Sequence, residues 1–96
     1  MVLSVKFVGA LRHVSGTGEL ALSCKSRVAI RELMDEIIKE LPEFKRSLID
    51  QQFGDPRPNT NTLVLVNGRE ISVLDGLETK LKDGDEVVLI PFVHGG

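Results

Sequence analysis

The chain lacks tryptophan and tyrosine and has only four phenylalanines in 96 residues. So few aromatic rings offer no platform for stacking nucleic-acid bases, and twelve basic against fourteen acidic residues make no basic footprint for nucleic acid or anionic lipid. No apolar run approaches the roughly 20 residues needed to cross a bilayer, and the first residues lack the pattern of a secretory signal. We therefore expect a cytoplasmic protein that binds neither nucleic acid nor membrane.

Groups suited to catalysis are equally scarce. Cys24 is the only thiol, and His13 and His94 are the only histidines, at spacings that match no zinc site and no Cys-His or Ser-His-Asp arrangement. A single cysteine forms no internal disulfide, which fits a reducing compartment. Because Cys24 lies on the apolar side of a predicted strand, we interpret it as a small buried hydrophobe in preference to a reactive thiol. We predict that the chain is not an enzyme and binds no metal or cofactor itself.

Two segments resemble ligand-binding loops without meeting their requirements. Residues 83–86 read Asp-Gly-Asp-Glu but lack the spacing and the distant glutamate of a calcium loop. Residues 15–18 are rich in glycine but lack the ending and the helix start of a phosphate-binding loop. We interpret the first segment as a turn and the second as a hairpin loop.

The N-terminal region alternates between apolar and polar residues. Leu3, Val5 and Phe7 share one face of a predicted strand. A second alternation follows the loop at residues 15–18 and places Leu20, Leu22 and Cys24 on one face. The two strands are predicted to form a hairpin with a mobile connection.

A helix follows, because apolar residues between Ile30 and Leu41 recur every three or four positions opposite a charged, solvated face. Pro42 ends that helix and favours the start of another, so a shorter helix is predicted over 43–52. We expect it to bury Phe44, Leu48 and Ile49. Residues 54–59 hold two prolines and no apolar residue, which indicates a surface loop.

The C-terminal half contains three further predicted strands. Leu63–Val66 leads through Asn67-Gly68, a type I′ turn sequence, into a strand over 69–72. An irregular segment over 73–81 and a turn over 82–85 precede a strand over 86–90 that is apolar on both faces, as a central strand should be. The order of elements predicts an α+β protein of one domain, with the first and last strands side by side at the centre.

The final residues are Val93-His94-Gly95-Gly96. Pro91 cannot extend a ladder of hydrogen bonds, so the chain is expected to leave the sheet there, and five residues reach at most roughly 17 Å. Glycines carry no Cβ to obstruct passage into a narrow active site. Phe92 and Val93, with His94, are expected to contact a partner, since apolar residues beyond a strand stay outside the core when a partner buries them. The alternative is that Phe92 and Val93 pack against the domain's own edge. The terminal carboxylate is unreactive until it is activated with ATP, and this chain has no phosphate-binding loop to bind ATP. A separate enzyme must therefore activate it.

Four motifs together resemble the small ubiquitin-like sulfur carriers of the MoaD and ThiS group and the ubiquitin-related modifiers. They are Val5-Lys6-Phe7, Leu65-Val66-Asn67-Gly68-Arg69, Leu81-Lys82-Asp83-Gly84-Asp85-Glu86-Val87, and Pro91 with Val93-His94-Gly95-Gly96. The motifs span nearly the whole chain, and their order and distance from the terminal glycines make the combination specific.

The resemblance implies a β-grasp (ubiquitin-like) domain over residues 1–96. Such a domain has a mixed sheet of about five strands, one long helix packed on one face, a shorter helical segment and a flexible tail, here 92–96. It also implies that a ubiquitin-activating-type adenylyltransferase (MoaB/MoeB/ThiF-like) uses ATP to adenylate Gly96, which then becomes a thiocarboxylate. Gly95 is the neighbour that lets the tail thread into the enzyme.

The final sulfur acceptor depends on which branch of the family the chain resembles. Its length and the segment 42–61 are similar to MoaD, whose tail enters the large subunit of molybdopterin synthase. MoaD-like tails commonly read Pro-Pro-Val before a small residue and Gly-Gly, whereas this chain has Phe92 and His94 at two of those positions. His-Gly-Gly is similar to the ubiquitin-related modifiers, which pass sulfur to transfer RNA or become attached to lysines. Molybdenum cofactor biosynthesis is the leading hypothesis, with tRNA thiolation, lysine conjugation and a non-activated interaction module as alternatives.

Overall fold

The computed structural model describes residues 1–25, 27–44 and 62–91, with the backbone alone at positions 14 and 15. The elements in chain order are β1 (Val2–Phe7), α1 (Ala10–Ser15), β2 (Glu19–Ser23), β3 (Val28–Ala29), α2 (Ile30–Glu40), η1 (Pro42–Phe44), β4 (Thr62–Val66), β5 (Arg69–Glu70), η2 (Ile71–Val73), η3 (Gly76–Glu78), β6 (Lys80–Leu81) and β7 (Glu86–Pro91), where η marks a 3-10 helix.

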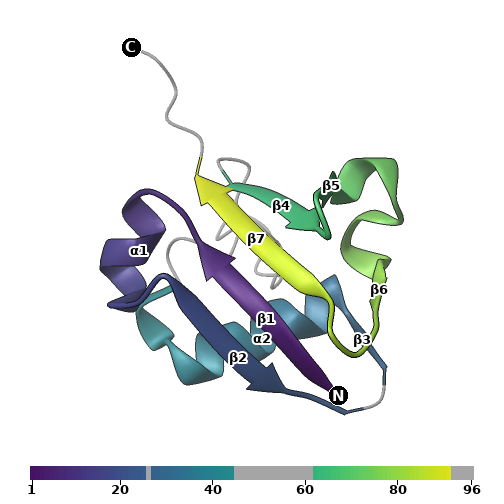
Figure 1. Ribbon diagram of the computed structural model, residues 1–96, viewed down its shortest axis with the longest axis horizontal. Coiled ribbons are helices and arrows are strands. Elements are labelled where there is room, and N and C mark those ends of the chain that lie inside the picture. Colours follow the sequence, from purple (N-terminus) through teal and green to yellow (C-terminus); the bar gives the residue numbers. More distant parts are fainter. Residues whose placement is uncertain (26, 45–61, 92–96) are drawn as a thin grey trace.

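Five strands form a mixed sheet in the order β2-β1-β7-β4-β5 (Figure 1). β1 and β7 run parallel, with Val5 opposite Val87 and Phe7 opposite Leu89, while every other pair in this sheet is antiparallel. The first and last strands therefore lie side by side, and β7 occupies the centre, as its apolar sequence predicts.

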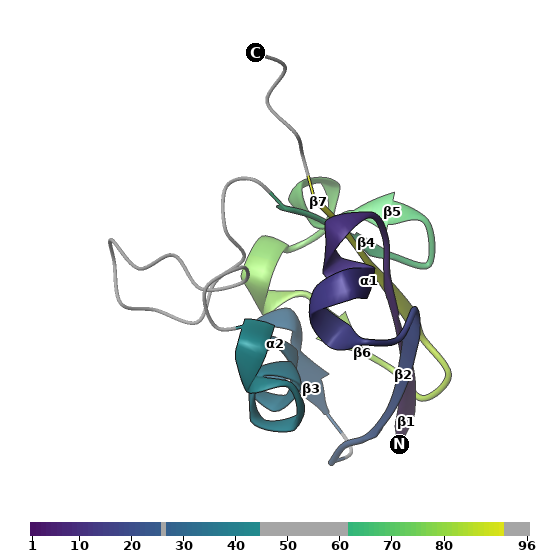
Figure 2. The ribbon, with the colours of Figure 1, turned by 90° about the vertical axis from the view of Figure 1, so that its left-hand side faces the viewer.

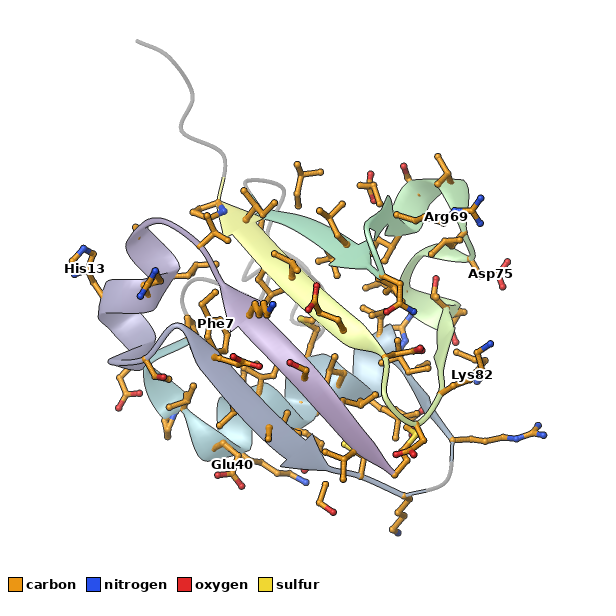
Figure 3. All side chains as sticks on the ribbon, viewed as in Figure 1. Phe7, His13, Glu40, Arg69, Asp75 and Lys82 are labelled. Atoms are coloured by element: carbon orange, nitrogen blue, oxygen red, sulfur yellow. The ribbon has the colours of Figure 1, made fainter. Side chains whose placement is uncertain are left out.

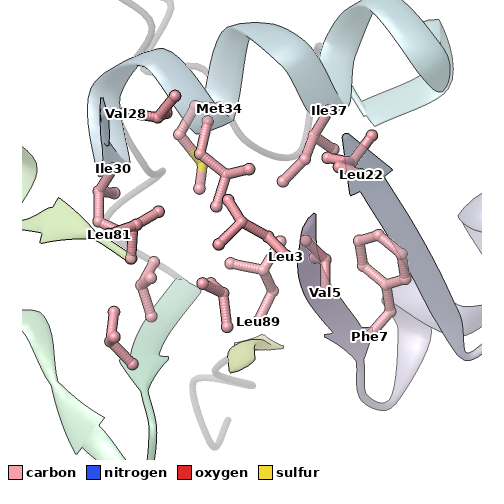
Figure 4. Close-up of a cluster of buried hydrophobic side chains, with 14 of the residues drawn as sticks. Leu3, Val5, Phe7, Leu22, Val28, Ile30, Met34, Ile37, Leu81 and Leu89 are labelled. Atoms are coloured by element: carbon pink, nitrogen blue, oxygen red, sulfur yellow. The ribbon is translucent and has the colours of Figure 1, made fainter. Parts of the chain in front are cut away.

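The molecule has two layers, because α2 packs on one face of the sheet (Figures 1 and 2). Alternation along each strand sends every second side chain toward this helix, and Leu3, Val5 and Leu89 are fully buried there. Ile30, Leu33, Met34 and Ile37 line the facing side of α2 (Figure 4). The apolar spacing of the predicted helix thus corresponds to its buried face, and the predicted helix over 30–41 is confirmed to within one residue.

Phe44 closes one end of the core. It lies in η1, and its ring stacks on Phe7 with centroids 4.8 Å apart. The predicted burial of Phe44 is confirmed. The rest of the helix predicted over 43–52, with Leu48 and Ile49, and the loop predicted over 54–59 lie outside the described residues.

The connection between β1 and β2 differs from the predicted loop. The two strands pair antiparallel as expected, but residues 10–15 form the short helix α1, and Leu11 enters the core with 3% of its surface exposed. Gly16, with a φ of 73°, ends α1 in the left-handed conformation. Leu11 and Val14 are the only large apolar residues among these six, and one such pair is too short to establish a helical period, which is why the sequence does not reveal this helix.

The segment predicted to be irregular, 73–81, is also more ordered than expected. It contains η3 and strand β6, which pairs antiparallel with β3 in a separate two-stranded sheet. Leu81 and Val28 are buried opposite each other in this pair. Strands of two residues are too short to show alternation, so only the tertiary structure identifies them.

The second hairpin is confirmed, with a shorter second strand than predicted. Asn67 and Gly68 have φ values of 50° and 86°, as a type I′ turn requires. β5 ends at Glu70 because the carboxylate of Glu70 accepts hydrogen bonds from the N–H and the Oγ–H of Ser72, at 2.6 and 2.7 Å. These bonds turn the chain into η2.

Candidate functional site

The predicted site residues follow the central strand directly. They are Phe92, Val93, His94, Gly95 and Gly96, and all five lie outside the described residues. The structure does describe the point from which they continue, at Pro91, the last residue of β7. Pro91 is therefore the base of the site.

Pro91 is held between neighbours on several sides. Thr62 of β4 is its cross-strand partner, and the N–H of Val8 donates to the carbonyl oxygen of Leu89 at 3.1 Å. Gly9 has a φ of 63°, and a Cβ at this position would lie 3.4 Å from Cγ of Pro91. Glycine thus allows the start of α1 to approach Pro91 closely. These contacts fix the position of Pro91, the residue from which the tail continues.

An apolar surface adjoins the base of the tail on the face of the sheet opposite α2. Leu63 and Leu65 of β4 lie beside Ile90 and Val88 of β7 in register, and all four are half-buried. No described helix packs on this face (Figures 1 and 2). We call these four residues the open-face patch. Val8, which follows β1, has 42% of its surface exposed. A contiguous apolar surface of this kind is typical of a partner interface.

An ion pair borders the open-face patch. Nζ of Lys6 lies 2.9 Å from Oε2 of Glu86 on the neighbouring strand. The hydrogen bond and the charge of Glu86 raise the pKa of Lys6 above its ordinary value. Since both side chains are well exposed, the pair adds little to stability. Its effect is to give the patch a polar edge.

Sequence reasoning missed the open-face patch, although the signal was present. The predicted strands over 63–66 and 86–90 are apolar on both faces, and the chain supplies one long helix to cover a single face. Among the described elements, none is then left to cover the apolar residues of the second face. Both facts are visible in the sequence, but a strand that is apolar on both faces predicts only a central position in the sheet.

Cys24 lies far from the base of the tail. It follows β2 and pairs with Met1, whose amino group donates to the carbonyl oxygen of Cys24 at 2.9 Å. Because β1 and β7 run parallel, Met1 and Pro91 lie at opposite ends of the sheet, roughly 25 Å apart along the strand direction. Cys24 packs against the core but is half-buried, not fully buried as predicted. Burial, followed by the charge of Glu36, raises the pKa of its thiol.

The other candidate ligands have structural roles or remain apart. Residues 82–85 form the predicted turn, in which the carboxylate of Asp85 accepts the N–H of Lys82 at 2.7 Å and Nδ2 of Asn67 at 2.9 Å. His13 is exposed on α1 (Figure 3). Within the described segments, no three His, Cys, Asp or Glu side chains lie close enough to hold a metal ion, and no helix is long and apolar enough to span a membrane.

A mixed sheet with parallel first and last strands, one helix across one face and a chain that continues from the central strand define a ubiquitin-like β-grasp protein. The model of the ThiS family matches residues 5–96, and the chain belongs to this family. The resemblance inferred from the four motifs is confirmed.

Individual relatives agree over nearly the whole length. The chain is 32% identical to small archaeal modifier protein 3 of Haloferax volcanii over 96 residues, which cover 100% of both chains. It is similar to the solution structure of small archaeal modifier protein 1 from Methanosarcina acetivorans, with a TM-score of 0.82, 32% identity and coverage of 99% and 96% of the two chains. It is also similar to a Pyrococcus furiosus protein provisionally described as subunit 1 of a molybdopterin converting factor, with a TM-score of 0.75, 26% identity and coverage of 97% and 99%.

The family is one of ubiquitin-like sulfur carriers and modifiers. This gives the class of activity to which the chain belongs.

Proposed function

We propose that this chain is a sulfur carrier whose Gly96 is adenylated and converted to a thiocarboxylate. The observation that carries the proposal is the match to the ThiS family model, which runs through to Gly96 and so includes the two glycines beyond β7. The alignment with the Haloferax volcanii relative, which covers all of both chains, also extends through Gly96.

The chemistry begins with an unreactive group. A terminal α-carboxyl group is ionised at neutral pH, and its negative charge repels nucleophiles. When a carboxylate oxygen attacks the α-phosphorus of ATP, pyrophosphate leaves and Gly96 becomes an acyl adenylate with AMP as a good leaving group. A sulfur nucleophile then displaces AMP, and the sulfur remains on Gly96. ATP is bound by the activating enzyme, and Gly96 is a substrate in this scheme.

The activating enzyme needs a surface to hold while Gly96 reaches its active site. The open-face patch supplies an apolar surface beside the base of the tail, and Phe92, Val93 and His94 extend this contact in the proposal. Gly95 leaves the backbone slender next to the reacting carboxylate. Pro91, held by its neighbours, fixes where the tail starts relative to the patch.

For the sulfur acceptor, we propose the molybdopterin precursor, reached when the tail enters a molybdopterin synthase large subunit. The length of the chain and the segment 42–61 support this assignment, and so does the similarity to the Pyrococcus furiosus protein. In this arrangement the chain is the non-catalytic small subunit.

A second function is favoured by a specific observation. Two relatives at 32% identity, each aligned over nearly the whole chain, are named modifier proteins, and the tail reads His94-Gly95-Gly96. In a modifier, a lysine amine displaces AMP from the same adenylate and forms an isopeptide bond. Sulfur donation for tRNA thiolation also starts from this adenylate.

The sulfur-carrier proposal is tested by incubating the protein with its activating enzyme, ATP and a sulfur donor. Intact-mass spectrometry should show the gain of one oxygen-to-sulfur exchange, located at Gly96 by fragmentation. The matched control lacks Gly95 and Gly96; we expect it to stay within about 0.5 kcal/mol of the parent in stability and to gain no mass. No gain by the parent, with an enzyme that activates another carrier in the same assay, would falsify the proposal.

The acceptors are separated by a second set of assays. The thiocarboxylate form, mixed with a molybdopterin synthase large subunit and pterin precursor, should lose its sulfur to the precursor. Digested cell lysate should instead yield lysine peptides bearing a remnant of the tail if the chain is a modifier. An unchanged cellular phenotype after deletion of Gly95 and Gly96 would contradict both and leave a non-activated interaction module.

A further inference from the structure

β2 is an edge strand of the sheet, and its outer side has unpaired backbone groups. Gly18 and Cys24 flank β2. The carbonyl oxygen of Gly18 accepts the N–H of Phe7, and Cys24 exchanges backbone hydrogen bonds with Met1, so the backbone groups of both residues point toward β1. Because the direction of the backbone groups alternates in an antiparallel pair, Glu19, Ala21 and Ser23 direct theirs outward. Figure 1 shows β2 at the margin of the sheet.

The outward N–H and C=O groups of these three residues differ in their hydrogen-bond partners. Both groups of Glu19 are met by Thr17, whose Oγ1 accepts the N–H of Glu19 at 3.4 Å and donates to its carbonyl oxygen at 3.0 Å. The N–H and C=O groups of Ala21 and Ser23 have no hydrogen-bond partner among the described residues. These two residues form what we call the free edge. It lies between Glu19, whose backbone groups bind Thr17, and Cys24.

The free edge lacks the features that usually prevent strand addition. β2 reads Glu-Leu-Ala-Leu-Ser, with no lysine, proline or bulge, and it pairs with β1 over its whole length. The opposite edge strand, β5, has only two residues. Of the two edges of this sheet, β2 is therefore the one that can template another strand.

A row of glutamates on α2 lies beside the free edge. A pocket of about 260 Å³ is lined by Ser23 and Cys24 on the strand side and by Glu32 and Glu36 of α2. Glu40 follows Glu36 by four residues and so continues this row along the helix, and in Figure 3 it projects on the same side of the molecule as β2. Lys25 and Arg27 also line this pocket, and Nζ of Lys39 lies 3.4 Å from Oε1 of Glu36.

We propose that the free edge of β2 binds an extended basic peptide segment of a partner protein as an added strand. The peptide backbone pairs with Ala21 and Ser23, and its lysine or arginine side chains face the row of Glu32, Glu36 and Glu40. A second copy of this chain is disfavoured at this edge, because two acidic rows would meet. The proposal does not depend on chemistry at Gly96, since β1 lies between β2 and β7, the strand that precedes the tail.

The test uses a peptide that alternates lysine and valine, with two controls: the same peptide with glutamate in place of lysine, and the lysine peptide N-methylated at alternate residues. In the free protein, the amides of Ala21 and Ser23 should exchange with deuterium faster than those of Leu20 and Leu22. The lysine peptide should protect the Ala21 and Ser23 amides, and both control peptides should fail to do so. Saturable binding that N-methylation leaves unchanged would show a non-specific charge effect and overturn the proposal.

Two variants separate the backbone contribution from the charge. Ala21→Pro removes an outward N–H and should abolish binding, whereas the matched control Ala21→Val keeps that N–H and should bind as the parent does. If Ala21→Pro unfolds the protein, the Glu36→Gln/Glu40→Gln variant is decisive. We expect its affinity for the lysine peptide to be about fivefold weaker than that of the parent, and the affinity of the control Glu43→Gln to be unchanged. Equal binding of all folded variants contradicts the proposed site.

Two further outcomes would also overturn the proposal. Protection of Ala21 and Ser23 in the free protein, together with a dimeric mass in solution, assigns the edge to a second copy. Peptide-induced shifts confined to the open-face patch assign the peptide to that surface. The variant lacking Gly95 and Gly96 should bind the peptide as the parent does, so failure of this proposal and failure of sulfur loading remain distinguishable.

Discussion

At the scale of single residues, Asn67 joins two parts of the chain that are distant in sequence. Its φ of 50° allows the type I′ turn, while Nδ2 donates to Oδ1 of Asp85 and Oδ1 accepts the N–H of Glu86, both at 2.9 Å. Asp85 is only 8% exposed, so the bond from Nδ2 satisfies a carboxylate that water reaches poorly. The turn thereby fixes the start of β7.

We expect Asn67→Ala to lower the free energy of unfolding by about 2 to 3 kcal/mol. The substitution removes two hydrogen bonds, one of which is donated to the buried carboxylate of Asp85. It also places alanine in the left-handed region, which is less costly for asparagine because of its polar side chain. Asn67→Gly keeps the backbone conformation but loses the same bonds, and should cost about 1 to 2 kcal/mol. Urea unfolding measures both, and full stability of the glycine variant would show that the amide contributes nothing.

The thiol of Cys24 should titrate at a higher pH in the folded protein than in the unfolded chain. Burial disfavours the thiolate and raises the pKa. The free energy of unfolding should therefore be unaffected by this thiol below its unfolded pKa and fall as the pH rises through the folded pKa. Iodoacetamide alkylation should reach half of its maximal rate at a higher pH in the native protein than in urea.

The matched control for this prediction is Cys24→Ala. Lys6 also has a raised pKa but starts from a higher ordinary value, so the fall in stability that disappears in Cys24→Ala belongs to the thiol. Identical alkylation profiles for the native and unfolded chains would contradict the assigned burial effect.

At the scale of elements, the sequence predicts those whose signal is local. α2 shows its apolar spacing over three turns, and the turn at Asn67-Gly68 requires residues that tolerate positive φ. By contrast, α1, β3 and β6 are six, two and two residues long, and they are ordered by contacts with distant parts of the chain. The free edge of β2 needed the register with β1, which no residue pattern supplies.

The short helix α1 is expected to be essential for the core despite its length. Leu11→Ala should lower the free energy of unfolding by about 3 kcal/mol, since it opens a cavity where the side chain is 3% exposed. His13→Ala, on the exposed side of the same helix, should change it by less than about 0.5 kcal/mol. Thermal unfolding of the two variants checks this, and equal stability would mean that α1 is not packed on the core.

At the scale of the whole molecule, the two faces of the sheet have different roles. α2 covers one face, and the other is left with the open-face patch next to the strand that continues into the tail. The α+β class, the central pair of strands and the strand that precedes the tail were predictable, because the strand order and a single long helix leave few arrangements. Which partner covers the second face depends on a molecule outside this chain, so the sequence could reveal only that the face is apolar.

This asymmetry leads to a prediction about activation. Leu65→Lys should leave the fold intact, because Leu65 is only half-buried and the new lysine would lie opposite Glu70 in the register of β4 and β5. The same charge in the middle of the patch should hinder docking of the activating enzyme and lower kcat/KM for adenylation about tenfold, measured by ATP–pyrophosphate exchange. Val73→Lys, at a side chain that is 73% exposed and outside the patch, carries the same added charge and should react as the parent does. If both variants were activated equally well, the enzyme would have to hold the carrier by its tail alone, and the open-face patch would need another partner.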